Sequence, residues 1–341
     1  MKHNPFSFVA PATASQSSSL PFVTIDLGTI VNNIRYLQTY AKNIAPVVKT
    51  DAYGLGAIQV VERLYAHHIK EFFVAYFEEG VILRENVPGD YRIYVLNDVK
   101  KRTRKDYEYF NLIPVLYDQE SIHYWKQHGH FYPCAVHFDT GMHRTGASIT
   151  TPIDHLNVVL VMSHLSISED ASHPMNEQQL KLFSSIPTKA RRSLANSGGI
   201  FLGPSYHFDL VRSGIACYGF IDFGHPEIKN CMKVFAHVLQ IDHVTEGYVG
   251  YCMQYEITRP TVIATLGFGH ADGAPLYIKY VKFGEYKAPV IGKVSMDLLT
   301  VDVTHVPESL WHTPAFISED WCTYSYQSAL ILSSRVKRIY Y

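Results

Sequence analysis

The strongest constraint on the fold is a series of eight short apolar segments, each rich in β-branched or aromatic residues. Most begin about 20 to 25 residues after the one before, and the stretches between them mix apolar and charged residues at helical spacing. Strand–helix alternation predicts parallel pairing, and eight such units predict a (β/α)8 barrel in the α/β class, with a doubly wound open sheet as the alternative. The segments are 46–48, 72–75, 93–96, 113–116, 135–138, 158–162, 194–195 and 210–211.

The pattern changes after about residue 234. Strand-like alternation, as in 262–266 and 299–303, replaces helical periodicity, and Gly and Pro become frequent. We therefore expect a barrel at residues 21–233 followed by a separate, mostly β domain at residues 234–341. Residues 1–20 are interrupted by prolines and contain a run of small polar residues, which predicts a flexible tail rather than a signal peptide.

Composition excludes several classes of protein. Of the 341 residues, 47% are hydrophobic, which is enough for a large core, and 30 Lys and Arg residues against 31 Asp and Glu residues leave a net charge of −1. This charge gives no global basic field for nucleic acid or an anionic membrane. No apolar run approaches the roughly 18 residues of a membrane span, so we expect a soluble protein. The five scattered cysteines lack a C-x-x-C motif and predict reduced thiols in a cytoplasmic protein.

Polar residues follow most of the predicted strands. In a barrel the strand ends and the loops after them build the site, so these residues predict a ring of polar groups around one cavity. Metal-binding motifs such as H-E-x-x-H are absent, so we expect no metal site. The polar residues are Lys49 with Tyr53, Asn97, Asp139 with Arg144, His164, Asn196 with Ser197, and Arg212 with Gly214.

Lys49 is the most informative of these residues. A lysine that directly follows an apolar strand is costly to bury unless it is paired or covalently used, although a surface lysine is the simpler alternative. The hydroxyl and the backbone amides of Tyr53-Gly54-Leu55-Gly56 suit a phosphate. Asp139-Thr140-Gly141 by itself is similar to an aspartic-protease motif, but that chemistry needs a second copy and the chain has none.

Taken together, eight blocks in order along the chain resemble those of the alanine racemases, a family that depends on pyridoxal 5′-phosphate and has the type III fold of such enzymes. The blocks extend over nearly all of the chain from residue 22 onward. They are Val47 to Gly56, Asp139 to Arg144, Met162 to His164, Ala195 to Gly198, Val211 to Gly219, Val249 to Tyr251, Gly269 to Gly273, and Val290 to Asp297.

The resemblance implies a set of cofactor-binding residues in the barrel. Lys49 would hold pyridoxal 5′-phosphate covalently, His164 would pack against its ring, and Arg212 would face the pyridine nitrogen. A guanidinium cannot accept a proton from that nitrogen, which would keep the ring a moderate electron sink and favour reprotonation over transamination. The residues expected at the phosphate are Tyr53, Asn196, Ser197, Gly214 and Ile215.

The resemblance also implies a two-base racemisation of alanine. Lys49 would serve the D face of the substrate and Tyr251 the L face, with Tyr251 entering from the partner subunit of a head-to-tail homodimer. Arg144 would orient Tyr251 and the substrate carboxylate, and Met296 would line the carboxylate end of the pocket. The reaction would interconvert L-alanine and D-alanine in the cytoplasm and supply D-alanine for peptidoglycan.

Three departures from the family pattern keep an alternative open. His137 stands where many members carry a carbamylated lysine, and His270 and Ser334 stand where tyrosines are usual. A wider mouth would suit a broad-specificity amino-acid racemase acting on serine or basic amino acids. A decarboxylase of the same fold is disfavoured by Arg212, because those enzymes place an acidic residue there. A non-catalytic cofactor-binding protein is disfavoured by the second domain.

Overall fold

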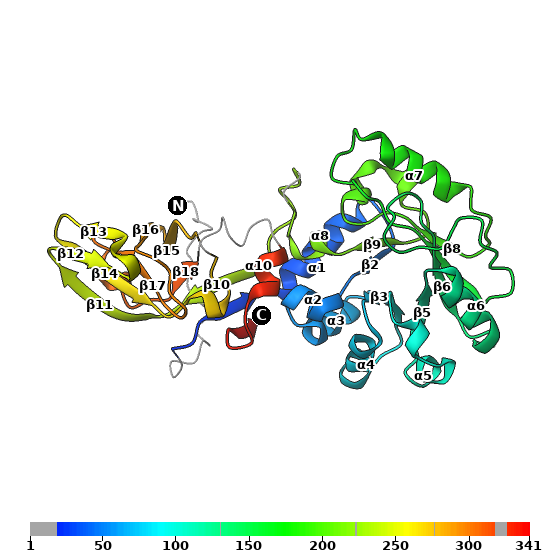
Figure 1. The fold of residues 1–341 in the computed structure, drawn as a ribbon, viewed down its shortest axis with the longest axis horizontal. Coiled ribbons are helices and arrows are strands. Elements are labelled where there is room, and N and C mark those ends of the chain that lie inside the picture. Colours follow the sequence, from blue (N-terminus) through cyan, green and yellow to red (C-terminus); the bar gives the residue numbers. More distant parts are fainter. Residues whose placement is uncertain (1–18, 130, 222–223, 276, 318–325) are drawn as a thin grey trace, which may run out of the picture. The chain divides into compact units, whose positions relative to one another are not determined.

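The computed structural model describes residues 19–129, 131–221, 224–275, 277–317 and 326–341. The chain divides into two compact units (Figure 1). We call residues 27–229 the barrel unit, and residues 19–26 with 230–341 the β unit. Of the predicted flexible tail, residues 1–18 lie outside the described residues.

Eight parallel strands form the barrel unit. Strands β3 to β8 make one six-stranded sheet, and β2 pairs with β9. The Val48 amide donates to the Phe73 carbonyl at 2.8 Å and the Arg212 amide donates to the Ala195 carbonyl at 3.0 Å, so the two sheets join at both edges and the barrel closes as predicted. The strands are β2 (Ile44–Pro46), β3 (Glu71–Val74), β4 (Arg92–Val95), β5 (Ile113–Leu116), β6 (Cys134–His137), β7 (Val158–Met162), β8 (Arg191–Ser193) and β9 (Val211–Ser213).

Apolar side chains fill the barrel, which explains why most of its strands are rich in apolar residues. Strand β8 differs, because its residues are polar and the apolar segment predicted at 194–195 lies just after it. Phe73 and Tyr94 stack with ring centroids 4.6 Å apart within a buried cluster that includes Val115. Where β3 and β8 begin, the Glu71 carboxylate accepts hydrogen bonds from the Tyr94 hydroxyl and from Arg191, both at 2.9 Å. The ion pair closes the barrel at the amino ends of these strands, and the aromatic pair fills its interior. A site can therefore form only at the carboxyl ends.

Helices connect most of the strands of the barrel unit, as the helical spacing between the predicted strands indicates. In α3, Val60, Val61 and Leu64 are buried at helical spacing. The helices are α1 (Leu27–Gln38), α2 (Lys49–Gly54), α3 (Ala57–Ala66), α4 (Phe77–Asn86), α5 (Arg104–Tyr109), α6 (Gln119–His128), α7 (Pro174–Ser184) and α8 (Ile215–Tyr218), with 3-10 turns η1 (Val99–Lys101), η2 (Gly198–Leu202) and η3 (Pro204–Tyr206).

The β unit is built on a nine-stranded sheet with the order β11-β14-β17-β16-β15-β18-β10-β1-β19, beside a hairpin of β12 and β13. It contains β1 (Phe22–Ile25), β10 (Met232–Ala236), β11 (Val238–Val244), β12 (Gly247–Val249), β13 (Tyr255–Ile257), β14 (Thr261–Leu266), β15 (Tyr280–Phe283), β16 (Tyr286–Ile291), β17 (Leu299–Asp302), β18 (Ala315–Ile317), β19 (Lys337–Tyr340), α10 (Tyr326–Ile331), and the 3-10 turns η4 (Tyr251–Met253), η5 (His270–Asp272) and η6 (Glu308–Leu310).

The boundary between the units differs from the predicted one, which assigned residues 21–233 to the barrel. Strand β1 is the main difference. It pairs antiparallel with β10 and parallel with β19, so residues 22–25 belong to the β unit. Phe22 stacks on Phe235 at 5.1 Å. These pairings join segments more than 200 residues apart, and local periodicity carries no information about them.

In the part of the chain that the structure describes, no helix combines the length and the apolar character needed to cross a membrane. Cys134, Cys217 and Cys231 are buried, and Cys252 is exposed. Cys322 lies outside the described residues.

Candidate active site

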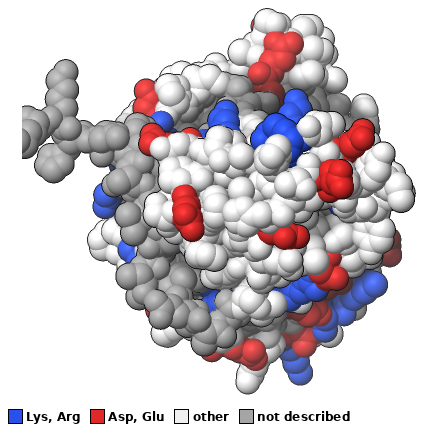
Figure 2. Space-filling view, turned by 90° about the vertical axis from the view of Figure 1, so that its left-hand side faces the viewer, with Lys and Arg blue, Asp and Glu red and all other residues white. Residues whose placement is uncertain are grey.

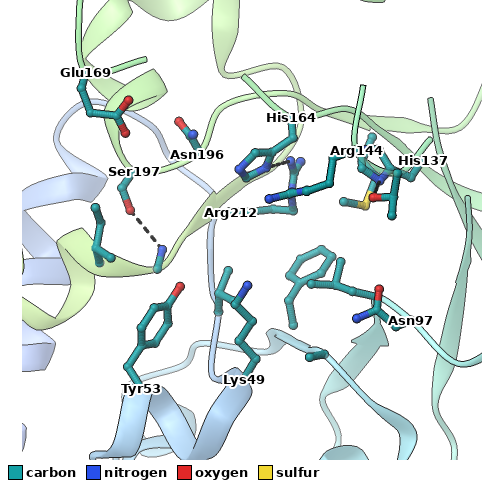
Figure 3. A pocket seen from close by; sticks show the side chains of 18 residues that line it. Lys49, Tyr53, Asn97, His137, Arg144, His164, Glu169, Asn196, Ser197 and Arg212 are labelled. Atoms are coloured by element: carbon teal, nitrogen blue, oxygen red, sulfur yellow. Dashed lines mark hydrogen bonds between the residues drawn. The ribbon is translucent and has the colours of Figure 1, made fainter. Parts of the chain in front are cut away.

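A left-handed turn presents Lys49 and Tyr53 at the end of β2. The four residues 50–53 all have φ between +52° and +59° and ψ between 33° and 51°. A left-handed helical residue other than glycine costs roughly 1–2 kcal/mol, so contacts with the surrounding structure must hold this turn. It directs the side chains of Lys49 and Tyr53 into the same space (Figure 3). The sequence predicted a loop here but not its handedness.

Glu79, in the first turn of α4, supports that turn. One carboxylate oxygen accepts from the Thr50 amide at 2.7 Å, and the other accepts from the Ala75 amide at 2.6 Å and the Tyr76 amide at 3.1 Å. Its charge also opposes the fall in the Lys49 pKa that burial causes. Sequence reasoning missed Glu79, because nothing in its local pattern distinguishes it from an ordinary acidic residue at a helix start.

The nine site residues predicted in the barrel line one cavity of about 430 Å³ at the carboxyl ends of the strands (Figure 3). These are Lys49, Tyr53, Arg144, His164, Asn196, Ser197, Arg212, Gly214 and Ile215. Asn97, named with the polar ring, also lines it, together with His137, Thr145 and Glu169. The residues predicted from the sequence thus follow six different strands and meet in one cavity.

One end of the cavity has the features of a phosphate cradle. The Ser197 hydroxyl accepts hydrogen bonds from the amides of Gly214 at 3.1 Å and Ala216 at 3.2 Å. A Cβ on Gly214 would come within 2.3 Å of the Tyr53 hydroxyl oxygen, so glycine is required for this close approach. Asn196 shapes the adjoining loop, since its side-chain oxygen accepts from the Gly199 amide at 3.0 Å. Hydroxyls and backbone amides bind phosphate without adding charge.

Arg212 occupies the cavity floor, buried among oxygen acceptors. Its guanidinium donates to the Ser193 carbonyl at 2.8 Å, to the Ser193 hydroxyl at 2.6 Å and to the Ser163 carbonyl. Burial, with a smaller effect of nearby Arg144, lowers the pKa of Arg212 to about 9, which leaves it protonated at neutral pH. It can therefore act only as a hydrogen-bond donor.

His164 lies against Arg212, with 3.3 Å between its Nδ1 and the guanidinium. Burial and then the charge of Arg212 hold the His164 pKa well below its usual range, so the ring is neutral. Because the guanidinium can only donate, Nδ1 must accept and the ring proton must be on Nε2. Arg212 thus fixes the tautomer of His164.

Positive charge dominates the cavity. Lys49, Arg144 and Arg212 all line it, and Glu169 is the one carboxylate among its lining residues. Burial and then Arg144 lower the Lys49 pKa, and burial with the charges of Arg212 and Arg144 lowers that of His137 to about 3. This environment fits an anionic ligand. Among the described residues, no three His, Cys, Asp or Glu side chains are grouped to hold a metal ion.

Tyr251 and Met296 are not among the residues that line this cavity. They lie in the β unit with exposed side chains, Tyr251 at 67% and Met296 at 63% of full exposure. Their loops are neighbours, since a Cβ on Gly292 would come within 2.8 Å of the Val249 carbonyl oxygen. The two residues therefore share one region of the β-unit surface.

The three departures from the family pattern have ordinary local surroundings. His137 ends β6, with its Nδ1 3.4 Å from the Thr145 hydroxyl. His270 lies half-buried in η5, with its Nδ1 3.2 Å from the Ala274 carbonyl oxygen, and Ser334 is exposed. Only His137 lines the cavity of the barrel unit.

Both units match models of one protein family. Residues 25–222 match the N-terminal domain of alanine racemase, and residues 231–340 match its C-terminal domain. The two matches together span most of the chain, in the same order as the units along it.

Proteins named alanine racemase are similar to this chain over most of their length. Alanine racemase of Rickettsia canadensis is 39% identical over 85% of this chain and 87% of its own length. That of Rickettsia rickettsii is 36% identical over 94% of this chain and 99% of its own. The crystal structure of alanine racemase from Bartonella henselae with covalently bound pyridoxal phosphate is 34% identical, with a TM-score of 0.86 over 95% of this chain and 100% of that one. The chain belongs to the alanine racemase family.

Proposed function

We propose that this chain interconverts L-alanine and D-alanine with pyridoxal 5′-phosphate as its cofactor. The observation that carries the proposal is the left-handed turn, which delivers the Lys49 amine and the Tyr53 hydroxyl into the cavity that also holds Arg212 and the Ser197–Gly214 cradle. Membership of the alanine racemase family and the cofactor in the Bartonella henselae relative support it. Supply of D-alanine for peptidoglycan in the cytoplasm is the role that we infer from this reaction.

The donor set fits the cofactor. Ser197, Gly214, Ile215 and Tyr53 would hold the phosphate, Arg212 would donate to the pyridine nitrogen, and Lys49 would bind the aldehyde carbon. When bound, pyridoxal phosphate withdraws electrons from the Cα–H bond of an attached amino acid.

Arg212 limits how far that withdrawal goes. Its protonated guanidinium would disfavour a second positive charge on a pyridine nitrogen bound beside it. A neutral ring nitrogen withdraws electrons less strongly, which favours return of a proton at Cα over side reactions.

Racemisation needs a proton removed on one face of Cα and returned on the other. Lys49 would serve the D face, and burial helps because a lowered pKa leaves more of its amine uncharged. Tyr251 would serve the L face, with Arg144 orienting Tyr251 and the substrate carboxylate and Met296 lining the carboxylate end.

Exposure of Tyr251 and Met296 supports a shared site in a head-to-tail homodimer. Their neighbouring loops also expose Tyr248, Met253 and Leu298. Such an apolar group on one surface is typical of a protein–protein contact. Figure 2 shows the end of the β unit, where uncharged residues cover most of the visible face. A second copy would cover these loops and bring Tyr251 to the partner's cavity.

Absorbance and turnover of the purified protein test this proposal. We expect a band at about 420 nm that disappears after borohydride reduction, with a covalent adduct located at Lys49 by peptide mass analysis. Alanine should be converted faster than serine, lysine or arginine. Faster conversion of any of the other three would support the broad-specificity racemase instead, and failure to bind the cofactor would reject the proposal.

A further inference from the structure

The buried side-chain amide of Gln179 on α7 connects loops that follow β6 and β7. The Gln179 side chain is fully buried, at 0% exposure. Its nitrogen donates to the His164 carbonyl at 2.9 Å and to the Thr140 hydroxyl at 3.3 Å. Its oxygen accepts from the Ser166 amide at 2.9 Å and the Ser166 hydroxyl at 3.1 Å. All four hydrogen-bonding positions of the amide are therefore used.

The bonds continue from Gln179 to Arg212 and His164. Thr140 and Ser163 are both buried, and their hydroxyl oxygens are 2.7 Å apart. The Ser163 carbonyl in turn accepts from the Arg212 guanidinium. A second route is shorter, because the His164 carbonyl that Gln179 binds belongs to the residue whose ring contacts Arg212. Both routes end on groups that line the cavity.

Packing alone does not explain a glutamine at this position. An apolar side chain of similar length would cover the barrel equally well and would not have to be desolvated. A buried polar network in which every partner is satisfied instead fixes one arrangement of the groups it joins. The arrangement fixed here is that of the backbone at residues 163–166.

We propose that Gln179 is a positioning residue for the cofactor. It holds the Ser163 and His164 backbone so that the Arg212 guanidinium and the His164 ring meet the pyridoxal ring correctly. This inference rests on the proposed function and adds to it a residue that does not itself line the cavity.

Asn176 offers a matched control on the same helix. It is also buried, and its side-chain nitrogen donates to the carbonyls of Ile167 at 3.3 Å and Asp170 at 2.8 Å. These partners make no hydrogen bond to Arg212 or to the His164 ring among the described contacts. Loss of Asn176 should therefore weaken the attachment of α7 without moving the two cavity groups.

Cofactor titration of three variants tests the inference. Gln179→Met keeps the size of the side chain and removes its four bonds, Thr140→Val removes one bond to Gln179 and one to Ser163, and Asn176→Leu is the control. Apo forms are compared by thermal unfolding, then by titration with pyridoxal phosphate and by the absorbance maximum of the bound cofactor. We expect affinity to fall about tenfold in Gln179→Met, less in Thr140→Val, and not at all in Asn176→Leu.

The absorbance maximum separates positioning from general destabilisation. It should shift in Gln179→Met, because the donor to the ring nitrogen and the packing ring move, and stay unchanged in Asn176→Leu. The inference would be overturned if Gln179→Met and Asn176→Leu lost the same thermal stability and both kept the cofactor affinity and absorbance of the wild type. If Gln179→Met does not fold, unchanged affinity and absorbance in Thr140→Val would overturn it. Absence of cofactor binding or racemisation in the wild type would instead contradict the proposed function.

Discussion

The barrel unit and the β unit present their proposed site residues in opposite ways. In the barrel unit, Arg212 is 4% exposed and Ser197 is 5% exposed, and both are fixed by several hydrogen bonds. In the β unit, the Tyr251 and Met296 side chains are mostly exposed. The proposed cofactor residues of the barrel unit are thus held in place by the fold, whereas the proposed residues of the β unit would act only when a second copy covers them.

This difference has a consequence for mutation. Changes in the barrel unit should affect cofactor binding and stability, since its site residues are part of the fold. Changes at the exposed residues of the β unit should affect the reaction alone. Four variants test this division.

Lys49→Ala should have the largest effect. It removes both the covalent attachment point and one proposed base, so racemase activity should fall at least about 10⁴-fold. Borohydride should no longer attach pyridoxal phosphate to the chain. Lys42→Ala, at an exposed lysine of the same unit, serves as the control. Retention of a reducible covalent adduct in Lys49→Ala would show that another residue holds the cofactor.

Tyr251→Phe should lower racemisation about 10³-fold while leaving cofactor affinity unchanged. Exchange of the Cα proton of D-alanine with solvent should persist, because in our proposal Lys49 serves that face, and exchange from L-alanine should be lost. NMR in deuterated water measures both. Tyr248→Phe removes another exposed hydroxyl nearby and should behave as wild type. Equal exchange from both enantiomers in Tyr251→Phe would contradict the two-base scheme.

His137 should make the barrel unit sensitive to acid. Its pKa falls from 6.5 in the unfolded chain to about 3 in the fold, mainly through burial, so below pH 6.5 only the unfolded state takes up the proton. Stability is therefore lost as pH falls, by about 3 kcal/mol at pH 4 from this group alone. Urea unfolding at pH 7 and at pH 4 measures this loss. Between the two pH values, the free energy of unfolding of His137→Gln should fall by about 3 kcal/mol less than that of the wild type. An identical loss in wild type and His137→Gln would refute the buried neutral imidazole.

Gly214→Ala should have the smallest effect, a reduction in phosphate affinity of about tenfold. The new Cβ would lie 2.3 Å from the Tyr53 hydroxyl oxygen and would push it out of the cradle. The double variant with Tyr53→Phe should lose less than the sum of the single variants, because the phenol oxygen that clashes is gone. Additive losses would mean that Gly214 and Tyr53 do not share the cradle.

Sequence reasoning predicted the barrel well for a physical reason. Buried parallel strands are apolar on both faces, so most of the eight contain an apolar run, and residues after their ends must converge. Strand β8 is the exception, because its residues Arg191–Ser193 are polar and the predicted segment 194–195 lies just after it. Lys49, His164 and Arg212 were identified in this way and line the same cavity.

Features that depend on distant contacts were not predictable. Strand β1 joins the β unit through partners more than 200 residues away along the chain. The left-handed turn after Lys49 depends on Glu79, and the role of Gln179 depends on its hydrogen bonds to the two loops that follow β6 and β7. Glu79 and Gln179 are polar residues whose local sequence resembles that of an ordinary helix.

Mixing two inactive variants tests most directly whether the exposed β-unit residues complete the cavity of another copy. Lys49→Ala and Tyr251→Phe are unfolded together and refolded at equal concentration, and alanine racemisation is compared with each variant alone. A mixed dimer would contain one site with both wild-type residues, so activity should return to about a quarter of the wild-type value. Activity no higher than that of the separate variants, in a sample shown to contain mixed dimers, would contradict a site shared between subunits.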